Sequence, residues 1–288
     1  MNFHAVHLCV CVLAGNVVTR SYLIYKWFVA LFLVANQLLS LTLYSVDSHG
    51  HVRKASKYMI YATHWGFILV TVALNLDAIL VLGRYVIQQS HVSMNKRRPH
   101  YESCHRTLKL SMGLTATAYP NALFVTVMFW AFLYDYSQPF VLTWHSYVNL
   151  AVHLLQSVVV LIDTLVSSRP WRLWHAWCPM LCGLTYMFFN VLYILAFDGT
   201  GENGEPFVYD ILDWKNHPGT CALLVGGCVI GFPLIFAPFY LLAKFRDYCW
   251  KKYLSDPADR ESSDVATFGG HGVYAISIKL QDTKEPSQ

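Results

Sequence analysis

Charged residues are scarce in this sequence. Asp, Glu, Lys and Arg make up 13% of its 288 residues, whereas a soluble domain carries about 25%. Hydrophobic residues make up 55%, and they are gathered in runs of about 20, long enough to cross a hydrocarbon layer of roughly 30 Å. This pattern excludes an ordinary soluble domain and predicts a polytopic membrane protein.

The sequence also lacks the marks of a secreted or nucleic-acid-binding protein. It has no Asn-x-Ser/Thr sequon, and its eight cysteines form no paired framework because most lie in or beside apolar runs. We interpret them as buried thiols and expect no metal site and no cofactor. The net charge of +4 is too small to suggest nucleic-acid binding. The partners that we expect are membrane lipids.

The apolar runs predict an all-α bundle of six transmembrane helices. The predicted spans cover residues 22–44, 58–83, 108–134, 144–166, 178–197 and 218–245. We divide the chain into an N-terminal cytoplasmic segment (residues 1–20), a six-span transmembrane domain (residues 21–245) and a disordered cytoplasmic tail (residues 246–288). The tail is polar and rich in Ser and Asp, a composition typical of disorder.

Basic residues predict the orientation of the chain. Six spans place both termini on one side, and the segments beside the spans on that side, counted from Arg20 to Lys252, hold twelve Lys and Arg residues. The segments on the other side hold four. Since positive charge accumulates on the cytoplasmic side, we predict that both termini are cytoplasmic. The sequence leaves open whether the membrane is the plasma membrane or an endomembrane.

Polar residues recur on one face of the fourth predicted span. This stripe consists of Asn149, His153, Gln156, Ser157 and Thr164. Because polar side chains within hydrocarbon are costly unless they face protein, we expect the stripe to point into the bundle. The sixth span carries the pair Gly227-x-x-x-Gly231, a spacing that permits close helix approach.

Thr63 and His153 lie at similar predicted depths. Spans two and four run in the same direction, and their rise places Thr63 roughly 9 Å and His153 roughly 13 Å into the membrane. A hydroxyl beside an imidazole is the minimal nucleophile and base for acyl transfer. The alternative is structural, since an intramembrane Thr usually bonds its own helix and an intramembrane His often only pairs helices.

Histidines also suggest a haem site, which needs paired imidazoles at matched depth on neighbouring spans. The candidates are His64, His145, His153 and His175. The pair of His145 and His175 fails because these residues sit on opposite sides of the membrane. The pair of His64 and His153 stays open.

Two aspartates lie near the cytoplasmic ends of their spans. We expect Asp77 to pair with Arg84 and Asp163 with Arg169, because long basic side chains reach toward the interface. We prefer these ion pairs to the alternative interpretation, in which the two aspartates form part of a proton-conducting path.

Three stretches of the chain carry a resemblance to a known family. Residues Arg20–Leu31, Tyr61–Gly66 and Gly204–Trp214 together resemble the rolling stone family, which are multi-pass membrane proteins associated with myoblast fusion in insects. The resemblance covers roughly residues 20–252, and its last stretch is the most specific. More distantly, the six-span plan is similar to the androgen-induced and androgen-dependent membrane proteins. Those are intramembrane threonine hydrolases of fatty-acid esters of hydroxy fatty acids.

The second resemblance implies three site residues. Thr63 matches the family's nucleophile in Tyr61-Ala-Thr63, where Ala62 replaces a leucine, and His153 matches its histidine. Asn149 fits the first position of the histidine motif and supports the site. Leu150 and Leu154 stand where the family has His and Thr.

Two functions therefore compete. One is a hydrolase that takes a lipid-ester substrate laterally from the membrane, with Thr63 as nucleophile and His153 as base. The other is a non-enzymatic protein that acts in cell fusion or adhesion through its loops. A cavity lined by both residues would favour the first, and a filled bundle the second.

Overall fold

The computed structural model describes residues 18–44, 55–89, 98–134, 136–137, 141, 143–202, 204–250 and 252. Helices dominate these ranges, which contain no β-strand. Six helical stretches are long and apolar enough to cross a membrane. They cover Arg20–Tyr44, Ala62–Gln89, Arg106–Leu133, Trp144–Val166, Leu173–Ala196 and Pro218–Cys249. The predicted all-α, six-span architecture is confirmed.

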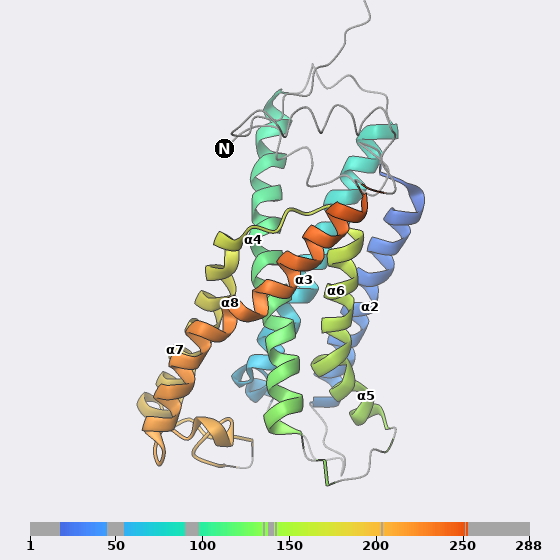
Figure 1. Cartoon of the computed structure of the whole chain (residues 1–288). Helices are drawn as coiled ribbons and strands as arrows, with labels where there is room; N and C mark the ends of the chain where they lie inside the picture. The colour runs from blue at the N-terminus through green and yellow to red at the C-terminus, as the bar shows by residue number, and fades with distance from the viewer. Residues whose placement is uncertain are drawn as a thin grey trace, which may run out of the picture.

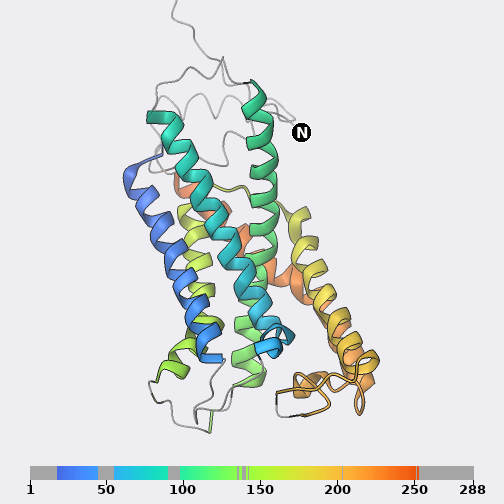
Figure 2. The ribbon, with the colours of Figure 1, turned by 180° about the vertical axis from the view of Figure 1, so that it is seen from behind.

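The helices alternate in direction through the bundle, as Figures 1 and 2 show from opposite sides. The first three spans are α2 (Arg20–Tyr44), α3 (Ala62–Gln89) and α4 (Arg98–Met128), the last extended by the π-helical η3 (Phe129–Leu133). The fourth span is built from α5 (Trp144–Leu150), the π-helical η4 (Ala151–Leu155) and α6 (Gln156–Val166). The fifth consists of η5 (Leu173–Ala176), α7 (Trp177–Val191) and η6 (Leu192–Ala196), and the sixth is α8 (Pro218–Cys249).

Several predicted span boundaries differ from the observed ones, by up to six residues. Helix α3 begins at Ala62, because the four residues before Tyr61 belong to a separate 3₁₀ helix, η1 (Ala55–Ile60). Helix α8 begins at Pro218, where a proline is well tolerated, and continues to Cys249. The first 17 residues and the chain beyond residue 252 lie outside the described residues.

Helix α4 occupies the middle of the bundle, with α2 and α7 at opposite edges (Figures 1 and 2). It contacts α3, α6, α7 and α8. The sixth helix, α8, crosses the bundle obliquely in front of α4 in Figure 1 and packs along α7. The segment between α7 and α8 folds at the end of the bundle where α3 begins.

One face of α3 is buried along most of its length. Its buried positions follow the helical period and include Thr63, Phe67, Val70, Leu74, Asp77 and Val81. The apolar members pack against Val152 and Val160 of the fourth span and Phe236 of α8. The stripe is therefore mostly apolar, with Thr63 at its start and the charged Asp77 about four turns further along.

The polar stripe of the fourth span points inward as predicted. Gln156 and Thr164 have no exposed surface and Ser157 is 2% exposed. Ser157 shares a 2.6 Å hydrogen bond with Thr126 of α4. The stripe therefore joins the fourth span to α4.

The close helix approach expected at Gly227 and Gly231 is wrong. A Cβ atom added at either position would meet nothing within 4 Å. The close contact occurs instead at Gly183 of α7, where a Cβ atom would overlap the ring of Phe232 from α8. The glycine that permits the close approach of α7 and α8 is Gly183 on α7, and the glycine spacing on α8 gave no sign of it.

Candidate functional site

Thr63 is the second residue of α3 and is 7% exposed. The backbone N–H of Ala62 donates a 3.1 Å hydrogen bond to the Tyr209 hydroxyl, which also hydrogen-bonds with the hydroxyl and the backbone N–H of Thr63. Burial raises the pKa of Tyr209, while these hydrogen bonds act in the opposite direction. The immediate partner of Thr63 is thus a tyrosine from the segment between α7 and α8.

That segment is fastened to the helices around it. Lys57 donates a 3.1 Å hydrogen bond to the Thr200 hydroxyl and a second bond to the Gly201 carbonyl. Further along, the Trp214 indole N–H donates to the Asn190 side chain at 2.8 Å. These bonds hold the segment on both sides of Tyr209.

His153 lies in the π-helical turn η4 of the fourth span. Its ring stacks on Phe129 with a centroid distance of 3.5 Å and an interplanar angle of 7°. Its Nδ1 atom is buried and has no hydrogen-bond partner among the described residues. A π-helical turn inside a helix often marks a functional site, and an unpaired buried nitrogen is uncommon.

An ion pair fixes the register between Thr63 and His153. Lys26 contacts both Asp77 and Asp163, so these two aspartates lie at one level. Ten residues before each of them stand Phe67 and His153. His153 is therefore level with Phe67, about one helical turn (roughly 6 Å) from Thr63 along the axis. Its Cα–Cβ bond tilts toward its own N-terminus, which reduces this offset.

The structure brings the two helices together but leaves the two side chains apart. Helix α3 contacts η4, and Val152 packs in the same cluster as Phe67. Within the described part of the chain, no hydrogen bond joins Thr63 to His153. Asn149 is half-buried on α5, one turn before His153.

His64 occupies a different environment from Thr63. Its ring stacks on Tyr58 at 3.6 Å, and its Nδ1 atom lies 2.6 Å from the Tyr58 carbonyl. His64 and His153 lie within electrostatic range of each other. One ring nitrogen of His64 is engaged by the Tyr58 carbonyl, and the His153 ring is stacked on Phe129. Among the described residues, no group of three His, Cys, Asp or Glu side chains is placed to hold a metal ion.

A small apolar pocket lies beside the start of α3. Its volume is about 50 Å³, and α3 contributes Ala62 and Gly66 to its wall, with Phe124 from α4 and Phe232 from α8. Neither Thr63 nor His153 lines it, so this pocket is not the cavity lined by both residues that the hydrolase hypothesis expects. A pocket of this volume has room for one or two water molecules, so an acyl chain enters only when side chains move.

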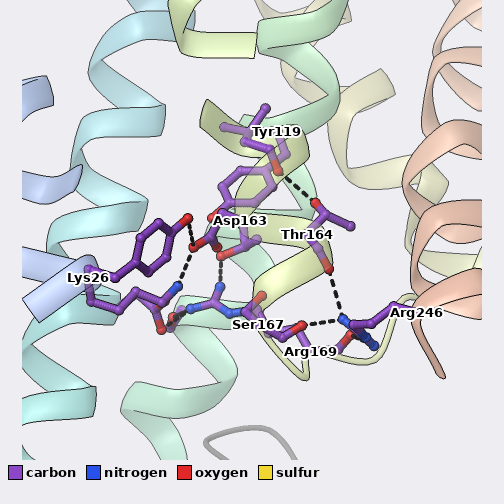
Figure 3. A network of polar contacts seen from close by, with 12 residues as sticks. Lys26, Tyr119, Asp163, Thr164, Ser167, Arg169 and Arg246 are labelled. Carbon is purple, nitrogen blue, oxygen red and sulfur yellow. Dashed lines mark hydrogen bonds and ion pairs between the residues drawn. The ribbon is translucent and has the colours of Figure 1, made fainter. Parts of the chain in front are cut away.

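A second polar cluster lies at the opposite end of the buried stripe (Figure 3). Lys26, 1% exposed, places its Nζ atom 2.5 Å from Asp77 and 2.6 Å from Asp163. The other Asp77 oxygen pairs with Arg169. Two cations and two carboxylates thus form a neutral network, which links α2, α3, α6 and the residues that follow α6.

Neutral donors and acceptors complete this charge network. Tyr25 and Tyr119 donate hydrogen bonds of 3.2 and 2.6 Å to Asp163, and Arg169 donates to Thr115 and Ser111 of α4. Arg169 was predicted to pair with Asp163, whereas its carboxylate partner is Asp77. Both Asp163 oxygens are already engaged, one by Lys26 and Tyr25 and the other by Tyr119. Because its charged groups all have partners, we interpret the network as a structural one that holds these helices together.

Arg246 of α8 closes the end of the fourth span beside the network (Figure 3). Its guanidinium donates to the carbonyls of Thr164, Ser167 and Arg169. The last carbonyls of a helix have no partner within it, and a cation is favourable there. Arg246 therefore joins α8 to the end of α6.

Comparison with known proteins gives the family. The family model described as Protein rolling stone matches residues 2–257. A curated relative, Protein rolling stone of Drosophila melanogaster, is 30% identical over 226 residues, which cover 78% of this chain and 76% of the relative. The chain belongs to the rolling stone family. No solved structure matches it.

The rolling stone match covers all six spans and both polar clusters. The resemblance seen in the sequence is confirmed, and the chain is an integral multi-pass membrane protein. The stretch Gly204–Trp214, one of the three that carried the resemblance, includes Tyr209 and Trp214, which bond to α3 and α7. Sequence reasoning missed Lys26, although a lysine inside a predicted span is a signal in itself.

Proposed function

We propose that this rolling stone-family protein is an intramembrane hydrolase of long-chain lipid esters, with Thr63 as nucleophile and His153 as general base. The observation that carries the proposal is the buried, unpartnered Nδ1 atom of His153. It belongs to a π-helical turn that contacts the helix bearing Thr63. Leaving a buried polar atom unpaired costs free energy, and a catalytic role is one reason that such an atom is kept.

The reaction proceeds by acyl transfer. The Thr63 hydroxyl oxygen attacks the ester carbonyl carbon, and His153 takes the hydroxyl proton. The C–O bond to the alcohol then breaks, and His153 returns the proton to the leaving alkoxide. Water, activated by the same imidazole, hydrolyses the acyl-threonine to a carboxylic acid and restores the hydroxyl.

Donors for the negative charge of the transition state lie at the start of α3, where the Tyr209 hydroxyl accepts them in this structure. The backbone N–H groups of Ala62 and Thr63 belong to the first helical turn and have no partner within the helix. Such groups at a helix N-terminus stabilise an anion. Asn149, one turn before His153, either orients the imidazole or donates an amide N–H.

Thr63→Ala and His153→Ala are each expected to lower ester hydrolysis by at least about a hundredfold, since each removes a group that acts in the chemical step. Thr63→Ser keeps a hydroxyl and retains part of the activity. The control is Thr71→Ala, because Thr71 is another buried threonine of α3 whose hydroxyl bonds only the Phe67 carbonyl at 2.9 Å. Hydrolysis of a long-chain ester and labelling by a fluorophosphonate are measured in membranes.

Equal hydrolysis by wild type and Thr63→Ala would remove the proposal. So would the absence of activity and labelling in the wild type under conditions that reveal a known serine hydrolase. The non-enzymatic function in cell fusion or adhesion would then stand.

We also propose that both termini are cytoplasmic, on the strength of the twelve-to-four distribution of basic residues. Asp198 lies beyond η6 with an 88% exposed side chain, and Arg172 is exposed at the opposite end of the bundle. In cells that carry the protein at their surface, Asp198→Cys is expected to react with an impermeant maleimide before permeabilisation. Arg172→Cys is expected to react only afterwards, and the reverse order would contradict this orientation.

A further inference from the structure

The segment Gly204–Trp214 reaches back from the α7–α8 connection onto the start of α3. We propose that this segment is an autoinhibitory plug, in which the Tyr209 hydroxyl occupies the place of the substrate's carbonyl oxygen. The inference rests on the proposed hydrolase function, since it names the regulation of that site. The structure is then the closed form of the enzyme.

The contacts of Tyr209 are those that an ester oxygen would need. Its hydroxyl oxygen accepts the Ala62 N–H at 3.1 Å and is bonded by the backbone N–H and the hydroxyl of Thr63. These are the helix N-terminal donors that would stabilise an oxyanion next to the nucleophile. While the phenol holds them, an ester carbonyl has no access to them.

The enclosure of the hydroxyl supports the same conclusion. Tyr186 of α7 lies beside it and donates a 2.8 Å hydrogen bond to the Ile60 carbonyl, just before α3. The Tyr61 ring packs edge-on against the Tyr209 ring at 5.8 Å. The phenol is therefore surrounded by aromatic side chains and backbone, and these fill the space next to Thr63.

The plug is built so that it can leave without unfolding the bundle. Its Val208 packs with Ile60 and Ile194 in a small cluster that Tyr209 and Trp214 border, and Trp214 donates a hydrogen bond to Asn190. This small cluster is separate from the main core cluster around Phe67. Gly204 has a φ of +95°, a left-handed conformation that glycine adopts without strain. Withdrawal of this segment opens Thr63 while the charge network at the other end of α3 stays in place.

The first experiment measures access to position 63 without relying on catalysis. Thr63→Cys is alkylated with N-ethylmaleimide in membranes, and the modified peptide is quantified by mass spectrometry against Cys249 as an internal reference. Adding Tyr209→Phe removes the hydroxyl and keeps the ring. We expect alkylation at position 63 to become about fivefold to tenfold faster, the effect of losing one or two hydrogen bonds.

The matched control is Tyr193→Phe, since the Tyr193 hydroxyl donates to the Thr200 carbonyl at 3.0 Å within the same connection. Tyr193→Phe is expected to leave the alkylation rate unchanged. Equal rates with Tyr209 and with Tyr209→Phe would overturn the plug, whatever the catalytic assays show.

The second experiment uses native Thr63. Tyr209→Phe is expected to raise ester hydrolysis several-fold over the wild type, and Tyr209→Phe combined with Thr63→Ala is expected to abolish it. Activity in the wild type with no gain in Tyr209→Phe would overturn the plug and leave the hydrolase intact. Faster alkylation at position 63 with no hydrolysis by any variant would overturn the hydrolase and, with it, the inhibitory role of Tyr209.

Discussion

Lys26→Met is expected to destabilise the bundle by about 3–5 kcal/mol, the usual cost of removing one partner of a buried ion pair. The substitution leaves Asp77 and Asp163 with one cation, Arg169, in a largely buried site. An uncompensated buried charge is costly because desolvation penalises the ion and nothing offsets it. Thermal unfolding of the detergent-solubilised protein, followed by size-exclusion chromatography, measures the loss.

A second substitution should recover part of this loss. Asp163→Asn alone leaves the network one charge too positive, whereas Lys26→Met with Asp163→Asn leaves Arg169 and Asp77 as a neutral pair. The double variant is therefore expected to unfold at a higher temperature than either single variant. Lys215→Met is the control, since Lys215 pairs with an exposed Asp198 at the surface, where ion pairs contribute little. Additive losses in the double variant would contradict a neutral network.

The second large effect is expected at the contact of α7 with α8. Gly183→Ala places a methyl group against the Phe232 ring, and overpacking of this kind costs about 1–3 kcal/mol. Phe232 is 1% exposed, so its ring cannot turn out to the surface, and the pocket of about 50 Å³ that it lines beside Gly183 is smaller than a phenyl ring. Gly226→Ala is the matched control, because a Cβ atom there meets nothing within 4 Å.

If Gly183→Ala and Gly226→Ala both unfold at the same temperature as the wild type, α7 can move away from α8 at this contact without cost, and the prediction is wrong. Phe232→Leu provides the complementary test. A smaller side chain leaves room for the methyl group, so Gly183→Ala with Phe232→Leu should lose less stability than the sum of the two single changes.

The spans could be predicted because the signal is one of composition. A run of apolar residues must cross the membrane as a helix, since no other backbone arrangement satisfies its hydrogen bonds in lipid. Six spans and an inward polar stripe at Gln156, Ser157 and Thr164 followed directly. The start of α3 was misplaced by four residues because Tyr58 and Ile60 are apolar enough for a span, although they belong to a 3₁₀ helix.

The partners of the polar residues could not be predicted from spacing. Asp77 was assigned the arginine nearest in its own helix, whereas its ion pairs come from α2 and from the residue three positions beyond α6. Thr63 was expected opposite His153, and its hydroxyl meets Tyr209, which is 146 positions away in the chain. Depth along a helix axis is readable from a sequence, but which face meets which neighbour depends on helix rotation.

The buried charge network also bears on how the chain enters the membrane during synthesis. Lys26 emerges first and Asp77 second, and these two residues lie on the adjacent helices α2 and α3. Asp163 and Arg169 emerge later, six positions apart. The four charged residues are thus synthesised as two successive pairs of opposite sign, and each pair has no net charge. A hairpin of α2 and α3 can enter the bilayer with its lysine already neutralised, and the fourth span brings its aspartate together with an arginine. The cost of carrying four ions into the bilayer is thereby divided between two insertion steps, neither of which moves a net charge into the hydrocarbon.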